Sequence, residues 1–212
     1  MKCCSTKGAA KFFSKNSSRY ARNFKRKGLD KAQQVLADGL LTLGIRGNSV
    51  LEIGCGVGGL HISLLDAGAV TAFGIDVSAE MVAKAREFAS QRGHANKVSY
   101  VVGDLLEMNG NVPVSDIVIM DKVLCCTYRP LAMICESASR TKKYFAVSYP
   151  SSRLLPRLMF STSEYVGKVL GWSFHPWYHR PELLEDEMKR SGLVEVYSER
   201  TWLWQVKVLE KK

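Results

Sequence analysis

The stretch VLEIGCGVGGL, residues 50–60, decides the fold. A short apolar run leads into a turn in which Gly54, Gly56 and Gly59 have the G-x-G-x-x-G spacing of a dinucleotide-binding turn between a strand and a helix. Glu52 stands two residues before the first of these glycines. A pyrophosphate prefers bare backbone N–H groups at a helix N-terminus, so an acid at this place favours a ligand with positive charge.

From residue 49 onward, short apolar strands alternate with helices. The pattern predicts strands at 49–54, 70–76, 97–104, 115–121 and 143–150, and helices at 58–68, 78–93, 129–140 and 181–192. Two further strands, 194–202 and 204–210, are joined by a tight turn and therefore pair antiparallel. The chain is thus expected to have an α/β fold with three layers. Its Rossmann-like, seven-stranded sheet is mostly parallel, has a C-terminal antiparallel hairpin strand, and binds ligands at the carboxyl ends of the strands.

The charge divides the chain into two parts. The formal net charge is +10, of which residues 1–47 carry +9, from 11 Lys/Arg and 2 Asp/Glu. Apolar positions three or four apart predict a helix over 29–43. We therefore expect a basic, helical N-terminal arm over 1–47 that acts as a lid, mainly through residues 20–47, and a nearly neutral body over 48–212. Such a distribution disfavours a nucleic-acid surface spread over the whole fold.

Composition also limits the compartment. No uncharged apolar run approaches the roughly 20 residues of a membrane span. The six cysteines do not form a disulfide scaffold, which favours a cytoplasmic protein. Targeting to an organelle by the basic N-terminus stays open.

Four motifs in order resemble the class I S-adenosylmethionine (SAM)-dependent methyltransferases. VLEIGCGVGG is similar to the first motif of that family, and GID, GDLLE and MDKVL are similar to the segments that follow its second, third and fourth strands. The resemblance covers residues 49–212. It implies a methyltransferase domain that binds SAM and releases S-adenosylhomocysteine (SAH).

The resemblance also implies a set of cofactor contacts. Asp76 would accept hydrogen bonds from the ribose hydroxyls, Asp104 with Leu105 would meet the adenine, and Asp121 would lie beside the methionine moiety. Glu52 would lie near the cationic methionine end. For each of these acids the alternative is a structural role, either as a buried acid or as the cap of a helix or loop. The expected cofactor-binding residues are Glu52, Gly54, Cys55, Gly56, Gly58, Asp76, Val77, Asp104, Leu105 and Asp121.

The residues that would bind the methyl acceptor are inferred only from their positions in the sequence. KGLDKA, VLCC, the aromatic segment ending in His179 and the WQVKVLE tail are similar to small methyltransferases related to magnesium-protoporphyrin O-methyltransferases, and this likeness supplies no substrate. We expect a small-molecule acceptor that is large or apolar and can be anionic. His179 is the candidate general base, and the expected substrate contacts are Cys125, Cys126, Tyr128 and Tyr178. The apolar segment 153–174 is expected to cover this acceptor, to complete the core or to lie on a membrane surface.

Several alternatives stay open. A dehydrogenase would explain the glycines but not Glu52 or Asp104. An RNA methyltransferase would use the basic arm, and a thiol or metalloid methyltransferase would use Cys125-Cys126 with Cys3-Cys4, although no zinc spacing is present and no bound metal is expected. A non-enzymatic SAM-binding protein is a further alternative. His61 and His94 are expected on a helix surface and in a loop. The sequence specifies neither the methylated atom nor the oligomeric state.

Overall fold

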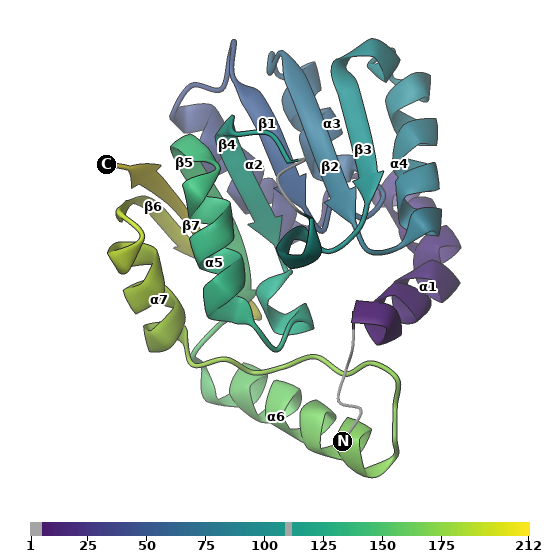
Figure 1. Cartoon of the computed structure of the whole chain (residues 1–212), viewed down its shortest axis with the longest axis vertical. Coiled ribbons are helices and arrows are strands. Elements are labelled where there is room, and N and C mark those ends of the chain that lie inside the picture. Colours follow the sequence, from purple (N-terminus) through teal and green to yellow (C-terminus); the bar gives the residue numbers. More distant parts are fainter. Residues whose placement is uncertain (1–5, 109–111) are drawn as a thin grey trace.

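A seven-stranded sheet forms the centre of the molecule (Figure 1). The computed structural model describes residues 6–108 and 112–212. The strand order is β3-β2-β1-β4-β5-β7-β6. The strands are β1 (Ser49–Ile53), β2 (Thr71–Asp76), β3 (Val98–Val102), β4 (Ser115–Asp121), β5 (Thr141–Pro150), β6 (Leu193–Arg200) and β7 (Trp204–Lys211).

The strand pairing confirms the predicted topology. Strands β1 to β5 are parallel to one another, whereas β7 pairs antiparallel with both β5 and β6. Strands β2 and β3 follow one another on one side of β1. The chain then crosses to the other side of β1, where β4 pairs with it. The order of strands therefore reverses between β1 and β4, which is the place where open α/β sheets bind ligands.

Helices cover both faces of the sheet, which confirms the three-layer fold. The helices are α1 (Thr6–Lys27), α2 (Lys31–Thr42), α3 (Gly59–Asp66), α4 (Ala79–Gln91), α5 (Pro130–Ser139), α6 (Leu154–Val169) and α7 (Pro181–Arg190), with short 3-10 turns η1 (Ala95–Lys97), η2 (Leu105–Glu107) and η3 (Leu124–Cys126). Side chains from α5 and α7 pack with one face of the central strands, and those from α2 and α3 pack with the other. Helix α4 packs with α3 beside β3.

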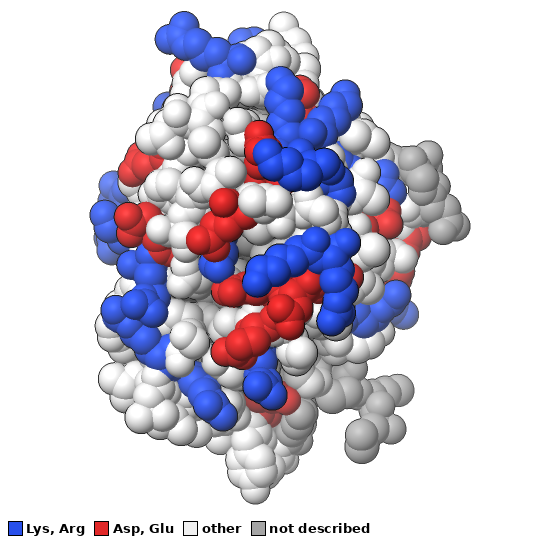
Figure 2. All heavy atoms as spheres, turned by 90° about the vertical axis from the view of Figure 1, so that its left-hand side faces the viewer, with Lys and Arg blue, Asp and Glu red and all other residues white. Residues whose placement is uncertain are grey.

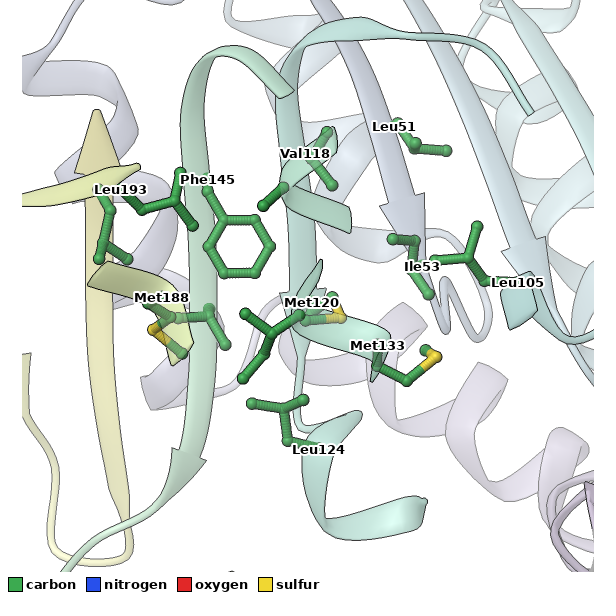
Figure 3. Packing of buried hydrophobic residues seen from close by; sticks show 14 of the residues in the cluster. Leu51, Ile53, Leu105, Val118, Met120, Leu124, Met133, Phe145, Met188 and Leu193 are labelled. Atoms are coloured by element: carbon green, nitrogen blue, oxygen red, sulfur yellow. The ribbon is translucent and has the colours of Figure 1, made fainter. Parts of the chain in front are cut away.

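Alternation along β1 assigns its side chains to the two faces. Leu51 and Ile53 point into the layer under α5 and α7, where Figure 3 shows Ile53 beside Leu105. Val50 belongs to the opposite layer, and Glu52 shares its side of the strand because side chains alternate with a period of two. This register directs the Glu52 carboxylate toward α3.

Local sequence signals set the helix boundaries. Asp30 caps α2 in a capping box with Gln33, and the Ser78 hydroxyl caps α4 by accepting from the Met81 N–H. Pro130 and Pro181 occupy the first helical positions of α5 and α7, where their missing N–H costs nothing. The predicted apolar face of α4, Met81, Val82, Ala85 and Ala89, is buried as expected.

Helices α1 and α6 lie outside the sheet layers. Helix α2 packs into the core through Leu36 and Leu40, whereas α1 lies beside α4 at one end of the sheet (Figure 1). The rings of Phe12 and Phe13 meet Phe174, which follows α6, at centroid distances of 4.9 and 5.4 Å. Across the described residues, no helix combines the length and apolar character needed to cross a membrane.

Candidate active site

One cavity of about 720 Å³ lies at the carboxyl ends of the parallel strands. Its walls include the glycine turn after β1 and the residues that follow β2, β3 and β4. Helix α1 and the loop before α2 close the other side. The cavity is therefore at the expected switch point, and residues of the basic arm form part of its wall.

The glycine turn owes its shape to left-handed backbone conformations. Gly54 has φ = 68° and Gly56 has φ = 53°, values that L side chains rarely adopt. A Cβ on Gly54 would also lie 2.5 Å from the Val123 side chain. Gly54, Cys55 and Gly56 line the cavity. Gly58 also has positive φ but packs away from the cavity. A Cβ at this position would lie 3.0 Å from the His61 ring and 3.1 Å from the Ala85 side chain.

Asp76, the last residue of β2, connects two parts of this wall. Its Oδ2 accepts from the Gly56 N–H at 2.8 Å, and its Oδ1 accepts from the Ser78 N–H at 2.9 Å. Burial raises the pKa of Asp76, and the two backbone hydrogen bonds oppose this increase. The carboxylate both fixes the glycine turn and faces the cavity, where its remaining lone pairs suit a vicinal diol.

Glu52 belongs to a buried chain of hydrogen bonds. Its Oε2 lies 2.5 Å from the His61 Nδ1 and accepts from the His61 backbone N–H, while the His61 Nε2 lies 2.7 Å from the Tyr100 hydroxyl. Burial raises the pKa of Glu52, against the effect of the hydrogen bonds from His61. His61 is fully buried, so its predicted place on the helix surface was wrong: the acid on β1 provides a partner inside the protein.

His94 lies in the loop before η1, as expected, and its Nε2 pairs with Asp66.

The other two acids of the motifs also line the cavity. The Asp104 carboxylate accepts from the Leu106 N–H and from the Thr6 hydroxyl of α1, at 3.0 and 2.8 Å. The Asp121 carboxylate accepts from the Ser148 hydroxyl at 2.6 Å and from the Gln33 amide at 3.0 Å. These bonds connect the strand ends to α1 and α2. Val77 and Leu105 lie in the same wall.

The far end of the cavity is apolar and aromatic. Its side chains come from distant parts of the chain and are Phe12, Phe13, Phe160, Phe174 and Trp204. Phe160 packs edge-on against Trp204 at a centroid distance of 5.8 Å. Such a lining suits a bulky ligand with an apolar surface.

Lys122 is the cation at the junction of the two ends. It is the one non-glycine residue with positive φ among the described residues, at 59°. Its Nζ pairs with Asp30, lies 3.5 Å from Asp121, and stands 5.5 Å from the centre of the Trp204 ring. Burial lowers its pKa, but the nearby carboxylates outweigh burial and raise the pKa above its ordinary value. A fixed positive charge therefore faces the cavity at neutral pH.

The expected acceptor residues fall into two groups. Cys125, Cys126 and Tyr128 line the main cavity, and the two sulfurs lie 3.9 Å apart. Tyr178 and His179 line a neighbouring hollow, with Tyr128 shared between the two. The His179 Nε2 lies 2.8 Å from the Thr127 carbonyl oxygen, and burial lowers the pKa of the imidazole. The structure thus brings the cysteines, but not His179, to the cavity wall.

Sequence reasoning did not select Lys122, Gln33 or Trp204. Lys122 follows Asp121 in DKVLCC, where a basic residue next to an acid at a strand end is the only available signal. Trp204 begins β7, and nothing local connects it with β4. Residues 6–108 and 112–212 contain no group of three or more His, Cys, Asp or Glu that could hold a metal ion. Cys3-Cys4 lies outside the described residues.

Comparisons with known proteins agree with this geometry. Residues 50–143 match a family described as a methyltransferase domain. The magnesium-protoporphyrin O-methyltransferase of Synechocystis sp. is 30% identical over 128 residues, which cover 57% of this chain and 50% of that protein. The alignment thus spans half the length of this curated relative.

Solved structures extend the likeness to the whole fold. The crystal structure of the Synechocystis magnesium-protoporphyrin IX methyltransferase with bound SAH superposes with a TM-score of 0.75 at 22% identity, covering 98% of this chain and 100% of that one. An O-methyltransferase family protein from Burkholderia thailandensis gives 0.72 at 15% identity, covering 92% of this chain and 59% of that one. Over residues 50–143 the chain is therefore similar to methyltransferase domains, and its fold is that of the SAM-dependent methyltransferases.

Proposed function

We propose that the protein transfers the methyl group of SAM to a large, apolar, anionic small molecule. The observation that carries this proposal is a single cavity with two chemically different ends. Backbone N–H groups and carboxylates line one end, and aromatic side chains with one lysine line the other. SAM has a ribose, an adenine and a cationic methionine end for the first, and the acceptor takes the second.

The residues at the first end suit SAM better than a dinucleotide. Asp76 would accept from the ribose hydroxyls, and Asp104 would accept from the adenine amine. Glu52 and Asp121 place negative charge where the cationic methionine end would lie, and a pyrophosphate would be repelled there. When bound, SAM supplies an electrophilic methyl group, and the main task of the protein is to hold the acceptor in line with it.

The second end favours a carboxylate acceptor on an apolar body. The Lys122 ammonium would bind the carboxylate, and the aromatic wall would pack against the apolar part. A carboxylate is ionised at neutral pH and needs no general base, so this acceptor does not require His179. The curated relative acts on a magnesium protoporphyrin, whose oxygen atoms belong to carboxylates on a large apolar ring. This likeness supports the acceptor class.

In this proposal the lid is the part of the arm that lines the cavity, namely α1, the loop before α2 and the first turn of α2, while the rest of α2 packs into the core. Thr6, Phe12 and Tyr20 of α1 line the cavity together with Asp30 and Gln33 of α2. The hydrogen bonds from Thr6 to Asp104 and from Gln33 to Asp121 would hold the lid against the cofactor-binding acids.

Methyl transfer from tritiated SAM tests the proposal. The protein is incubated with magnesium protoporphyrin and, separately, with a panel of apolar carboxylic acids, and the solvent-extractable products are then treated with alkali. A methyl ester releases volatile tritiated methanol, whereas N-, C- and thioether-methylated products retain their label. Ester formation that is lost in Asp76→Ala supports the proposal. Label transferred to mixed RNA, with none in the organic acids, would contradict it and favour the RNA methyltransferase.

A further inference from the structure

Helix α6 and the turn after it expose an unusual amount of apolar surface. The described residues include 21 exposed large apolar side chains, and nine of them fall within residues 154–172. These nine are between 40% and 71% exposed. They are Leu154, Leu155, Leu158, Met159, Tyr165, Val166, Val169, Leu170 and Trp172. Single exposed apolar residues are ordinary, but a contiguous group marks an interaction surface.

The inner side of the same helix is held by packing. Pro156, Phe160 and Gly167 are buried and lie close to one side of α6, because their spacings of four and seven residues are helical repeats. Phe160 packs against Trp204, and a Cβ on Gly167 would lie 2.7 Å from His175. The fold therefore accounts for the inner side of α6, and among residues 6–108 and 112–212 the outer apolar side remains exposed.

Basic side chains lie beside this apolar surface. Arg153 is exposed just before α6, and Arg157 is exposed in its first turn. Lys7, Lys11 and Lys15 are exposed on α1 at intervals of four residues. Helix α1 adjoins the end of the surface, because a Cβ on Gly8 would overlap the Ser173 carbonyl. In Figure 2 the lowest part of the molecule, the end at which Figure 1 draws α6, is mainly white with blue beside it.

We propose that α6 and the turn to Trp172, together with these basic residues, form a docking surface for an anionic lipid bilayer. The 16 residues of α6 are fewer than the roughly 20 needed to cross a bilayer, so the helix would lie in the interface with its apolar side in the acyl region. The lysines and arginines would face anionic headgroups. Phe160 and Phe174 line the acceptor end of the cavity, so docking would bring that end to the membrane. The inference concerns binding and stands independently of the proposed methyl transfer.

Flotation with vesicles tests this surface in the full-length protein. The vesicles contain phosphatidylcholine alone or phosphatidylcholine with phosphatidylglycerol. The test variant is Leu155→Glu/Leu158→Glu, which lies outside the cavity wall. The matched control is Val194→Glu/Val196→Glu, which adds the same charges at similarly exposed apolar positions of β6. Thermal unfolding of each variant checks that it folds, and calorimetry with SAM reports on the proposed function separately.

The proposal expects wild type and the β6 variant to float with the phosphatidylglycerol vesicles, and to float less as salt is raised. The α6 variant is expected to lose at least about tenfold in partitioning, because two charges would enter the apolar region. Equal flotation of the α6 and β6 variants would overturn the proposal. Absence of wild-type flotation would also overturn it. Light scattering that shows a wild-type dimer, made monomeric only by the α6 variant, would assign the surface to a second copy of this chain.

Discussion

The two ends of the cavity are built in different ways. At the cofactor end, each acid accepts hydrogen bonds, from the sheet and its turns or from the helices around it, as Asp76 accepts from Gly56 and Ser78. At the acceptor end, aromatic side chains from α1, α6, the loop before α7 and β7 meet through ring contacts, as in the pair Phe160–Trp204. Hydrogen bonds specify direction as well as distance, whereas apolar packing tolerates changes of shape.

This difference separates cofactor specificity from acceptor specificity. The cofactor end is fixed by the strands themselves, so substitutions there should change SAM affinity and leave the choice of acceptor alone. The acceptor end depends on elements added around the sheet. Substitutions there should change the acceptor KM and leave SAM affinity nearly unchanged.

The largest expected effect is that of Asp76→Ala. Because hydrogen bonds to a charged group contribute about 1.5–3 kcal/mol, we expect the Kd for SAM to rise by roughly ten- to 150-fold. Calorimetry measures the Kd, and thermal unfolding checks that the fold is kept. Asp186→Ala removes an exposed carboxylate of α7 and should leave the Kd unchanged. An unchanged Kd in Asp76→Ala would remove Asp76 from the cofactor site.

Lys122→Gln tests the acceptor end. Loss of the charge should raise the KM for a carboxylate acceptor about tenfold or more, from the same 1.5–3 kcal/mol per charged hydrogen bond. The Kd for SAM should rise by less than the KM, because the Lys122 ammonium also lies 3.5 Å from Asp121, which is proposed to face the methionine end. Lys142→Gln, on the exposed start of β5, is the matched control. A large increase in the SAM Kd with no change in KM would reverse the assignment of the two ends.

The pH dependence of SAM binding should report the protonation of Asp76. Burial raises its pKa, so the carboxylate is protonated at a higher pH than an ordinary aspartate, which titrates near about 3.9. As pH falls through the raised pKa, Asp76 loses its charge and the affinity for SAM declines. In Asp76→Asn the affinity should be lower at neutral pH and should lack this decline. The same acid limb in both proteins would attribute it to another group.

A smaller effect is expected from Tyr100→Phe, which removes one end of the buried chain from Glu52 through His61. The hydroxyl contacts both the His61 Nε2 and the Ala85 carbonyl oxygen, so its loss should reduce the free energy of unfolding by about 1–3 kcal/mol. Urea unfolding measures the change, with the exposed Tyr165→Phe as control. The Kd for SAM should stay within about twofold, because Tyr100 does not line the cavity. A large loss of SAM affinity would show that the chain of hydrogen bonds positions the glycine turn.

The sequence predicts the sheet well because its signals are local. The glycines after β1, Ser78 before α4 and Pro130 before α5 act within a few residues, so the positions of strands and the boundaries of helices follow from them. The acids proposed to face the cofactor were expected from the resemblance to the methyltransferase motifs. They line one cavity because parallel strands bring their carboxyl ends together at one edge of the sheet. His61 was misjudged because its partner Glu52 is set by strand alternation, which places the two side chains in one layer.

The acceptor end is harder to predict because its contacts join distant residues. Trp204 and Lys122 are 82 positions apart in the sequence, and no sequence feature near either residue indicates that the two side chains meet. Likewise, no local pattern in the sequence indicates that His179 lines a neighbouring hollow whereas Cys125 lines the cavity. Such positions depend on how α6 and its flanking loops cross the end of the sheet, which is a property of the assembled fold.

A calorimetric titration of SAM, and separately of NAD, into the purified protein tests the proposed cofactor most directly. SAM should bind with micromolar affinity, Asp76→Ala should lose most of that affinity, and NAD should not bind. Binding of NAD in place of SAM would show that the turn over residues 50–60 holds a pyrophosphate in spite of Glu52, and would contradict the central claim.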